Sequence, residues 1–119
     1  LFDGELIGYG GLTNCSWVDK RSELSFLVST DRYQNEELYD KDFTAFIHLM
    51  KQVCFEALSF NRIFTETYDI RSHHLKILEK NGFQFEGRMK EHVSIQGKYV
   101  DSLLHGCLTS SYSKINRFV

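Results

Sequence analysis

This chain of 119 residues lacks the features that mark several specialised classes of protein. No apolar run approaches the ~20 residues that a membrane-spanning helix requires. The acidic opening at residues 1–5 does not resemble a signal peptide. Proline is absent, which carries no functional implication. The net charge of −2 provides no broad basic field for nucleic acid or an anionic membrane, so we expect neither as a partner.

Metal-binding and disulfide patterns are also missing. Cys15, Cys54 and Cys107 form an odd, widely spaced set that fits neither a zinc site nor a disulfide framework. Reduced thiols are the simplest interpretation, and they predict a cytoplasmic protein. His73 and His74 are adjacent, and adjacent helical side chains point about 100° apart, so such pairs rarely bind one ion together. We therefore expect no metal site.

What the chain does have is an ordinary globular composition with many aromatic rings. Hydrophobic residues make up 42% of the chain and aromatic residues 14%. This length is enough for one domain with a modest core. We expect residues 1–119 to form a single domain. Because the chain does not begin with Met, we also expect it to be a piece of a longer protein.

Hydrophobic periodicity predicts an α/β fold. Alternation of apolar and polar residues indicates strands at 5–14, 22–29, 62–68, 83–95 and 98–108. Helical spacing indicates two helices, at 42–59 and 72–80, and leaves 30–42 as a polar loop and 109–119 as a weakly patterned tail. A strand after each helix implies crossover connections. The prediction is a mixed, partly parallel sheet of about five strands with two helices.

The last third of the chain carries a family resemblance. Its order of short segments is Glu79-Lys80-Asn81-Gly82-Phe83, Glu86-Gly87, Arg88 to His92, and Gly97-Lys98-Tyr99-Val100-Asp101. Each segment alone would only end a helix or turn a hairpin. Their order resembles the C-terminal half of GNAT-superfamily N-acetyltransferases, in the subgroup of ribosomal-protein-alanine N-acetyltransferases. The resemblance implies a GNAT-like core that lacks the first strand and first two helices of a family domain.

This resemblance implies an enzyme that uses acetyl-CoA. Acetyl would pass by direct attack to a primary amine, which could be a protein N-terminus, an amino sugar or a small amine. Residues 22–28 are similar to the family strand that splays from its neighbour and pairs with the pantetheine arm. Phe26, Leu27 and Val28 occupy the matching positions, and Glu23 matches a carboxylate that draws a proton from the amine. The alternative for Glu23 is an exposed strand residue paired with Arg21 or Lys20.

The segment that should bind the pyrophosphate departs from the family pattern. Residues 34–44 replace a glycine-rich loop, yet they contain no glycine and hold four acidic residues: Glu36, Glu37, Asp40 and Asp42. Negative charge opposes phosphate binding. Four residues at the expected start of the first helix are still candidates for contacting the cofactor: Lys41, Asp42, Phe43 and Thr44.

Three further positions also differ from the family. Arg71 aligns with an Asn that hydrogen-bonds the cofactor arm, and Arg71 could instead reach a phosphate. His74 aligns with a Ser and is a further candidate for binding the cofactor. Leu78 aligns with the Tyr that protonates the leaving thiolate, and Leu78 cannot transfer a proton. Tyr68 and Tyr99 are alternative proton donors.

These departures support a second hypothesis, a non-catalytic GNAT-like domain that serves binding, regulation or dimerisation. Backbone N–H groups converging at 42–44 with room for phosphate would favour the enzyme. Glu36 or Glu37 in that space would favour the second hypothesis. The strand at 5–14 should leave an unpaired sheet edge, which a preceding segment or a second copy of the chain could cover. A third hypothesis is a protein-binding module that works through this edge.

Overall fold

The structure is a computed structural model that describes residues 8–28 and 34–116, with side chains described for 10–26 and 34–112. The elements, in chain order, are β1 (Gly8–Ser16), β2 (Arg21–Val28), α2 (Glu36–Lys51), the π-helical segment η1 (Gln52–Ala57), β3 (Arg62–Tyr68), α3 (Ser72–Lys80), β4 (Gln84–Ile95), β5 (Lys98–Leu108) and α4 (Thr109–Asn116). In this part of the chain no helix is long and apolar enough to cross a bilayer.

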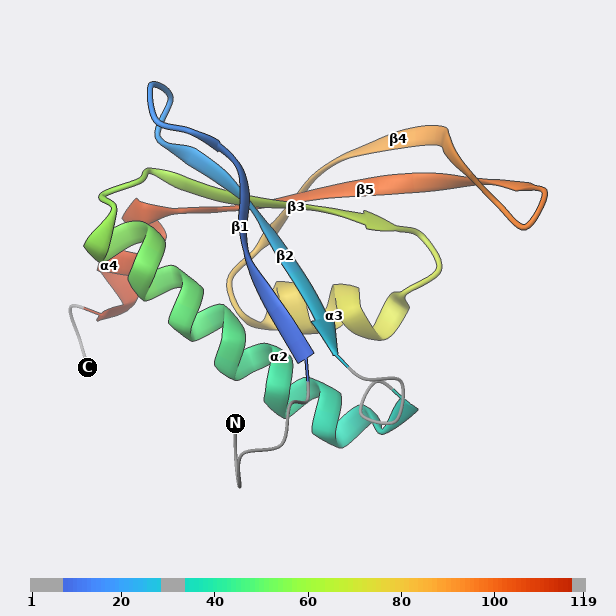
Figure 1. The fold of residues 1–119 in the computed structure, drawn as a ribbon, viewed down its shortest axis with the longest axis horizontal. Coiled ribbons are helices and arrows are strands. Elements are labelled where there is room, and N and C mark those ends of the chain that lie inside the picture. Colours follow the sequence, from blue (N-terminus) through green and yellow to red (C-terminus); the bar gives the residue numbers. More distant parts are fainter. Residues whose placement is uncertain (1–7, 29–33, 117–119) are drawn as a thin grey trace.

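The strands form one five-stranded sheet in the order β1-β2-β3-β5-β4. Strands β2 and β3 are parallel, and the other neighbours are antiparallel. Helices α2 and α3 lie against each other and cover the sheet (Figure 1). The predicted α/β class and the mixed, partly parallel sheet are therefore confirmed.

The first helix begins earlier than the sequence pattern predicted. Helix α2 starts at Glu36, and Asn35 caps it by accepting a hydrogen bond from the N–H of Leu38 at 3.1 Å. The predicted loop over 30–42 is thus wrong for its second half. The first two turns of α2 bury only Tyr39, so their apolar spacing is too sparse to recognise. Glu36 and Glu37 lie in the first turn, where negative charge stabilises the helix dipole.

The number of helices was also underestimated. The predicted continuous helix to residue 59 changes at Gln52 into the π-helical η1. Helix α4 follows β5 directly in the tail that was expected to be weakly patterned. Polar residues dominate α4, so its sequence lacks the apolar stripe on which a helix prediction depends.

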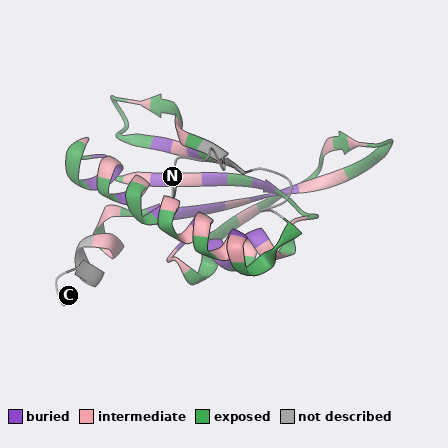
Figure 2. Ribbon diagram, turned by 60° about the horizontal axis from the view of Figure 1, so that its bottom comes forward, coloured by how far each residue is buried: buried purple, intermediate pink, exposed green. Residues whose placement is uncertain are grey.

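A single core lies between the sheet and the helices. Helix α2 contributes Tyr39, Phe43 and Ile47, and α3 contributes Ile77 and Leu78. Along β3, buried residues alternate with less buried ones, and Figure 2 shows the distribution of burial over the sheet. Each fully buried apolar side chain contributes roughly 1.5–3 kcal/mol. Leu78, at the position of the family's proton donor, is fully buried and belongs to this core.

Two predicted turns are confirmed. Helix α3 ends at Lys80, and Gly82 follows with a φ of +91°, a left-handed conformation that glycine adopts without steric cost. Between β4 and β5, Gln96 and Gly97 both have positive φ, as a two-residue type I′ hairpin requires. The ammonium of Lys51 donates a hydrogen bond to the carbonyl of Asn81, so α2 is tied to the end of α3.

Candidate active site

The central feature of the sheet is the place where β2 and β3 separate. The two strands pair at Ser22 with Ile63 and at Glu23 with Phe64, and no pair beyond Glu23 occurs in the described part of either strand. Further along, β2 remains paired with β1, and β3 remains paired with β5. The backbone edges that face each other across the opening are therefore free of this ladder. This confirms the splayed strand that the resemblance implied.

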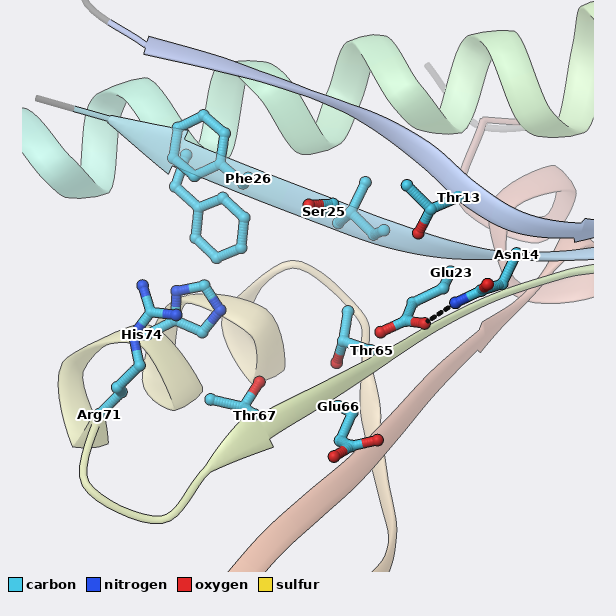
Figure 3. A pocket seen from close by; sticks show the side chains of 12 residues that line it. Thr13, Asn14, Glu23, Ser25, Phe26, Thr65, Glu66, Thr67, Arg71 and His74 are labelled. Carbon is cyan, nitrogen blue, oxygen red and sulfur yellow. Dashed lines mark hydrogen bonds between the residues drawn. The ribbon is translucent and has the colours of Figure 1, made fainter. Parts of the chain in front are cut away.

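A cavity of about 280 Å³ occupies this opening. Its walls come from β1, β2, β3, α2 and α3 (Figure 3). Among the predicted site residues, five line the cavity: Glu23, Phe26, Phe43, Arg71 and His74. Residues far apart in the sequence thus converge where the strands part.

The strand wall of the cavity carries a carboxylate. Asn14 donates a hydrogen bond from its side-chain amide to Oε1 of Glu23 at 2.7 Å. The second carboxylate oxygen points toward the space between β2 and β3 (Figure 3). Arg21, the alternative partner expected for Glu23, pairs with Asp19 at 2.8 Å instead. Glu23 therefore faces the cavity with one oxygen oriented by an uncharged donor.

Glu66 on β3 also lines the cavity, with its carboxylate on the side of β3 opposite to the side chains of Thr65 and Thr67 (Figure 3). Glu66 is exposed, and its Oε2 lies 3.9 Å from Nε2 of His92 on β4. Neighbouring Thr65 and Thr67 are buried and also line the cavity. The Oγ1 atom of Thr65 has no hydrogen-bond partner among the described residues. Buried hydroxyls are normally paired, so this atom is an available hydrogen-bonding group in the cavity wall.

The helix wall is built from a chain of hydrogen-bonded polar groups, of which Tyr39 and His74 are buried. The guanidinium of Arg71 donates to the hydroxyl of Tyr39 at 3.1 Å, and this hydroxyl is hydrogen-bonded to Nδ1 of His74. The ring of His74 stacks on Phe43 with centroids 4.4 Å apart. Burial lowers the pKa of His74 to about 3, and the charge of Arg71 contributes to this shift. His74 is therefore a neutral imidazole at neutral pH.

Sequence reasoning missed Tyr39 because the residue fell in the predicted loop. The spacing of four residues between Tyr39 and Phe43 is a helical signal that could have identified it. Asn14, Thr65 and Thr67 were missed as well. They are single polar residues on strands, and nothing in their spacing distinguishes a cavity wall from a solvent-exposed face.

Phe26 anchors the free end of β2 to α2. Its ring stacks on Phe43 at 4.8 Å and on Phe46 at 4.7 Å between centroids. Leu27 and Val28 continue β2, where they pair with Tyr9 and Gly8, and their side chains lie outside the described residues. The aromatic contacts hold this stretch of β2 on the helix layer, away from β3.

The expected helix start at 42–44 needs correction. Because α2 begins at Glu36, the N–H groups of Asp42, Phe43 and Thr44 lie in its second and third turns, where intrahelical bonds occupy them. Thr44 donates its hydroxyl to Asp40 at 3.1 Å and accepts from the side chain of Asn81 at 3.2 Å. These backbone N–H groups are therefore not free to form a phosphate cradle, and cofactor contacts from side chains at 41–44 stay a prediction. Of the four residues, only Phe43 lines the cavity.

The alternative proton donors also lie elsewhere. Tyr68, at the end of β3, and Tyr99, beside the hairpin, are both exposed and do not line the cavity. Within the described ranges, no cluster of three or more His, Cys, Asp or Glu residues is placed to hold a metal ion. The carboxylate and hydroxyl side chains that line the cavity can support proton transfer and hydrogen bonding.

Comparisons with solved structures establish the fold. A point mutant of the spermidine N-acetyltransferase SpeG from Vibrio cholerae has a TM-score of 0.78 and 19% identity, covering 92% of this chain and 62% of its own. A chimera of that enzyme with hSSAT has a TM-score of 0.81 and 21% identity, covering 92% and 66%. Mutant forms of the spermidine/spermine N-acetyltransferase SpeG from the same organism have a TM-score of 0.80 and 24% identity, covering 95% and 64%. The chain thus spans less than two thirds of these proteins.

No curated protein matches the chain. The family model described as Acetyltransferase (GNAT) domain matches residues 2–104. This match includes all of the strands that form the cavity and both helices that cover it. The chain therefore belongs to the GNAT acetyltransferase domain family.

Proposed function

We propose that this chain carries the acetyl-transfer site of an acetyl-CoA-dependent N-acetyltransferase whose acceptor is a primary amine. One observation carries the proposal: the Glu23 carboxylate lines a cavity where two parallel strands part. Membership of the GNAT family supports the same chemistry. Because the chain spans less than two thirds of its structural neighbours, the proposal concerns this site within the protein that contains it.

The residues present fit the acyl end of acetyl-CoA. This co-substrate supplies an acetyl group activated as a thioester. The free edge of β2 at 24–28 can pair with amide groups of an extended arm, as an added strand does. A volume of about 280 Å³ suits the acyl end of the arm. The hydroxyl of Thr65 offers one further hydrogen bond.

Glu23 is proposed as the general base. An amine attacks a thioester carbonyl only in its neutral form, so the proton of an ammonium must first leave. The oxygen of Glu23 that points into the cavity can take this proton directly or through a water molecule. A new C–N bond then forms, the C–S bond breaks, and the proton that the attacking nitrogen gives up passes to the departing thiolate. Asn14 keeps the other oxygen engaged and does not compete for the proton.

A cationic small amine is the acceptor that we favour. The carboxylate of Glu23 lies in the cavity wall, and carboxylates attract ammonium groups. The named neighbours are spermidine acetyltransferases, which agrees with this preference. A protein N-terminus, as in the ribosomal-protein-alanine subgroup, and an amino sugar are the other acceptors to compare.

A non-catalytic binding domain is the second candidate. It is favoured by Glu36 and Glu37, which place negative charge in the first turn of α2, where the cofactor's pyrophosphate would approach. The buried Leu78 in place of a proton donor points the same way. Lys41 lies in the second turn of α2, and Arg71 donates a hydrogen bond to Tyr39 of the same helix, so we propose these two cations as the residues that would offset the acidic charge.

Pairing of β1 with a further strand is also proposed. β1 pairs with β2, and no other described strand pairs with it. An exposed edge of this kind recruits another strand. The partner would be another segment of the same protein or a second copy of the chain.

Cys15, Cys54 and Cys107 are free thiols, and we propose a cytoplasmic location on that basis.

Calorimetric titration of acetyl-CoA into the protein, at low and moderate salt, tests the proposal first. We expect micromolar binding that weakens with salt, followed by thiol release when spermidine is added. Peptides with an N-terminal alanine, and glucosamine, serve as competing acceptors in the same assay. Absence of binding at millimolar acetyl-CoA in a folded sample would overturn the enzyme and favour the binding domain.

A further inference from the structure

We propose that Asn14 is a positioning residue that holds the Glu23 carboxylate in its reactive orientation. The inference rests on the proposed acetyl transfer and extends it to a residue outside the strand that carries the base. Asn14 lies on β1, and its side-chain amide donates to Oε1 of Glu23 at 2.7 Å. Both residues line the cavity between β2 and β3 (Figure 3).

The backbone conformation at Asn14 turns its side-chain amide toward Glu23. The register of β1 against β2 shifts between Thr13 and Ser16, which marks a bulge. Asn14 lies inside the bulge with a φ of +48°, in the left-handed region. Bulges re-aim side chains and occur often beside active sites. In a regular strand, the side chain next to Thr13 would point to the opposite face of the sheet.

The bulge is fixed from the neighbouring strand. Ser22 is fully buried, and its hydroxyl donates to the carbonyl of Thr13 at 2.9 Å. The sulfur of Cys15 lies 3.1 Å from the same hydroxyl oxygen. Ser22 thus contacts the residues on both sides of Asn14 while it immediately precedes Glu23. The donor and the carboxylate are held by one local structure, so their relative position is determined.

Conformational preference alone does not account for Asn14. Asparagine tolerates positive φ better than most residues, so it could be present only for the turn. Four other positions with positive φ are occupied by residue types without that preference, namely Lys20, Ser59, Glu91 and Gln96. Positive φ therefore does not require asparagine in this chain. What distinguishes Asn14 is its hydrogen bond to the base in the cavity wall.

Asn14→Gly separates the two explanations. Glycine adopts positive φ freely, so the bulge is retained while the amide is lost. Gln96→Gly is the matched control, because it makes the same change at positive φ in the distant β4–β5 turn. In the complete protein we expect Asn14→Gly to lower kcat by about tenfold or more, the value of one hydrogen bond to a charged group. KM for acetyl-CoA and the melting temperature should match those of Gln96→Gly.

Equal kcat in Asn14→Gly and the wild type would overturn the positioning role, provided that Glu23→Gln is impaired. Loss of activity in the wild type itself would instead count against the proposed function. If the wild type is inactive, the hydrogen bond can still be tested without turnover, by measuring proton exchange of the Asn14 side-chain amide by NMR. We expect this exchange to become faster in Glu23→Ala, because the acceptor is removed. An unchanged rate would show that the bond is absent and would overturn the inference.

Discussion

The two walls of the cavity differ in how far they bury their ionisable groups. On the strand wall, Glu23 is only partly buried and keeps one carboxylate oxygen toward open space. On the helix wall, His74 is buried and its imidazole is engaged with Tyr39 and stacked on Phe43. The first group can exchange a proton with a ligand, whereas the second is held neutral by its surroundings.

This difference separates reactivity from stability within one site. A partly exposed side chain contributes little to folding, so its removal affects mainly chemistry. A buried hydrogen-bonded group contributes to folding, because its removal leaves a buried donor or acceptor without a hydrogen bond, and the desolvation of that atom is then uncompensated. We expect substitutions on the strand wall to lower activity, and substitutions on the helix wall to lower stability.

Glu23→Gln should have the largest effect. Glutamine keeps the shape of glutamate but cannot accept a proton from an ammonium, so we expect kcat to fall by about 100-fold or more. The free energy of unfolding should change by less than about 0.5 kcal/mol. Steady-state kinetics and urea denaturation measure the two effects, with the exposed Glu91→Gln as a control. A large loss of stability in Glu23→Gln would contradict the separation of the two walls.

The helix wall predicts a loss of stability in acid. The pKa of His74 is lowered from 6.5 to about 3 by burial, so the unfolded chain binds a proton that the native chain does not bind. Stability is then independent of this group above pH 6.5 and falls as the pH decreases from 6.5 toward about 3. Denaturation at several pH values should show a weaker decrease in His74→Phe. Equal pH dependence in the two proteins would place the titration elsewhere.

Tyr39→Phe should have a smaller effect on the same wall. Removing the hydroxyl leaves Nδ1 of His74 and the donor of Arg71 without this partner. We expect a loss of about 1–3 kcal/mol in the free energy of unfolding. The fall in kcat of the folded enzyme should be less than that in Glu23→Gln. If kcat falls more in Tyr39→Phe than in Glu23→Gln while the free energy of unfolding is unchanged, then Tyr39 takes part in the chemistry.

Thiol labelling should give the smallest effect on folding and a clear difference in rate. Cys15 is exposed on β1, whereas Cys54 and Cys107 are buried on the helix side. Burial raises the pKa of Cys54 to about 11 and also raises the pKa of Cys107. A thiol reagent at pH 8 should modify one site rapidly and the other two only on unfolding. Cys15→Ser should remove the fast phase, and two fast phases would contradict the described burial.

The sequence predicted the parts of the fold that rest on strong periodicity or on special turn residues. Strands β3 and β5, helix α3, Gly82 and Gly97 lie as expected. In each case a local signal matched the final environment: alternation, an apolar stripe, or a residue that tolerates positive φ. Glu23 and Phe26 were proposed as site residues from the resemblance to the GNAT family, and both line the cavity.

The start of α2 and the helix wall could not be predicted in the same way. The first two turns of α2 are mostly polar on the surface, and their one buried residue, Tyr39, owes its position to contacts with Arg71 and His74 more than thirty residues later. Apart from the single spacing of four residues between Tyr39 and Phe43, these tertiary contacts leave no local pattern. The bulge at Asn14 is similar, since it depends on Ser22 from the next strand.

The short pairing of β2 with β3 has a consequence for how the amides of the sheet exchange with solvent. Beyond Glu23, alternate N–H groups of both strands face a gap in the interior of the sheet. In deuterated water, these amides should exchange faster than those on the β3–β5 side, which stay in a continuous ladder. A ligand that lies along β2 as an extra strand would slow them selectively. The exchange rates of these amides therefore report whether a ligand lies between β2 and β3, and they can be measured for each residue without any turnover of substrate.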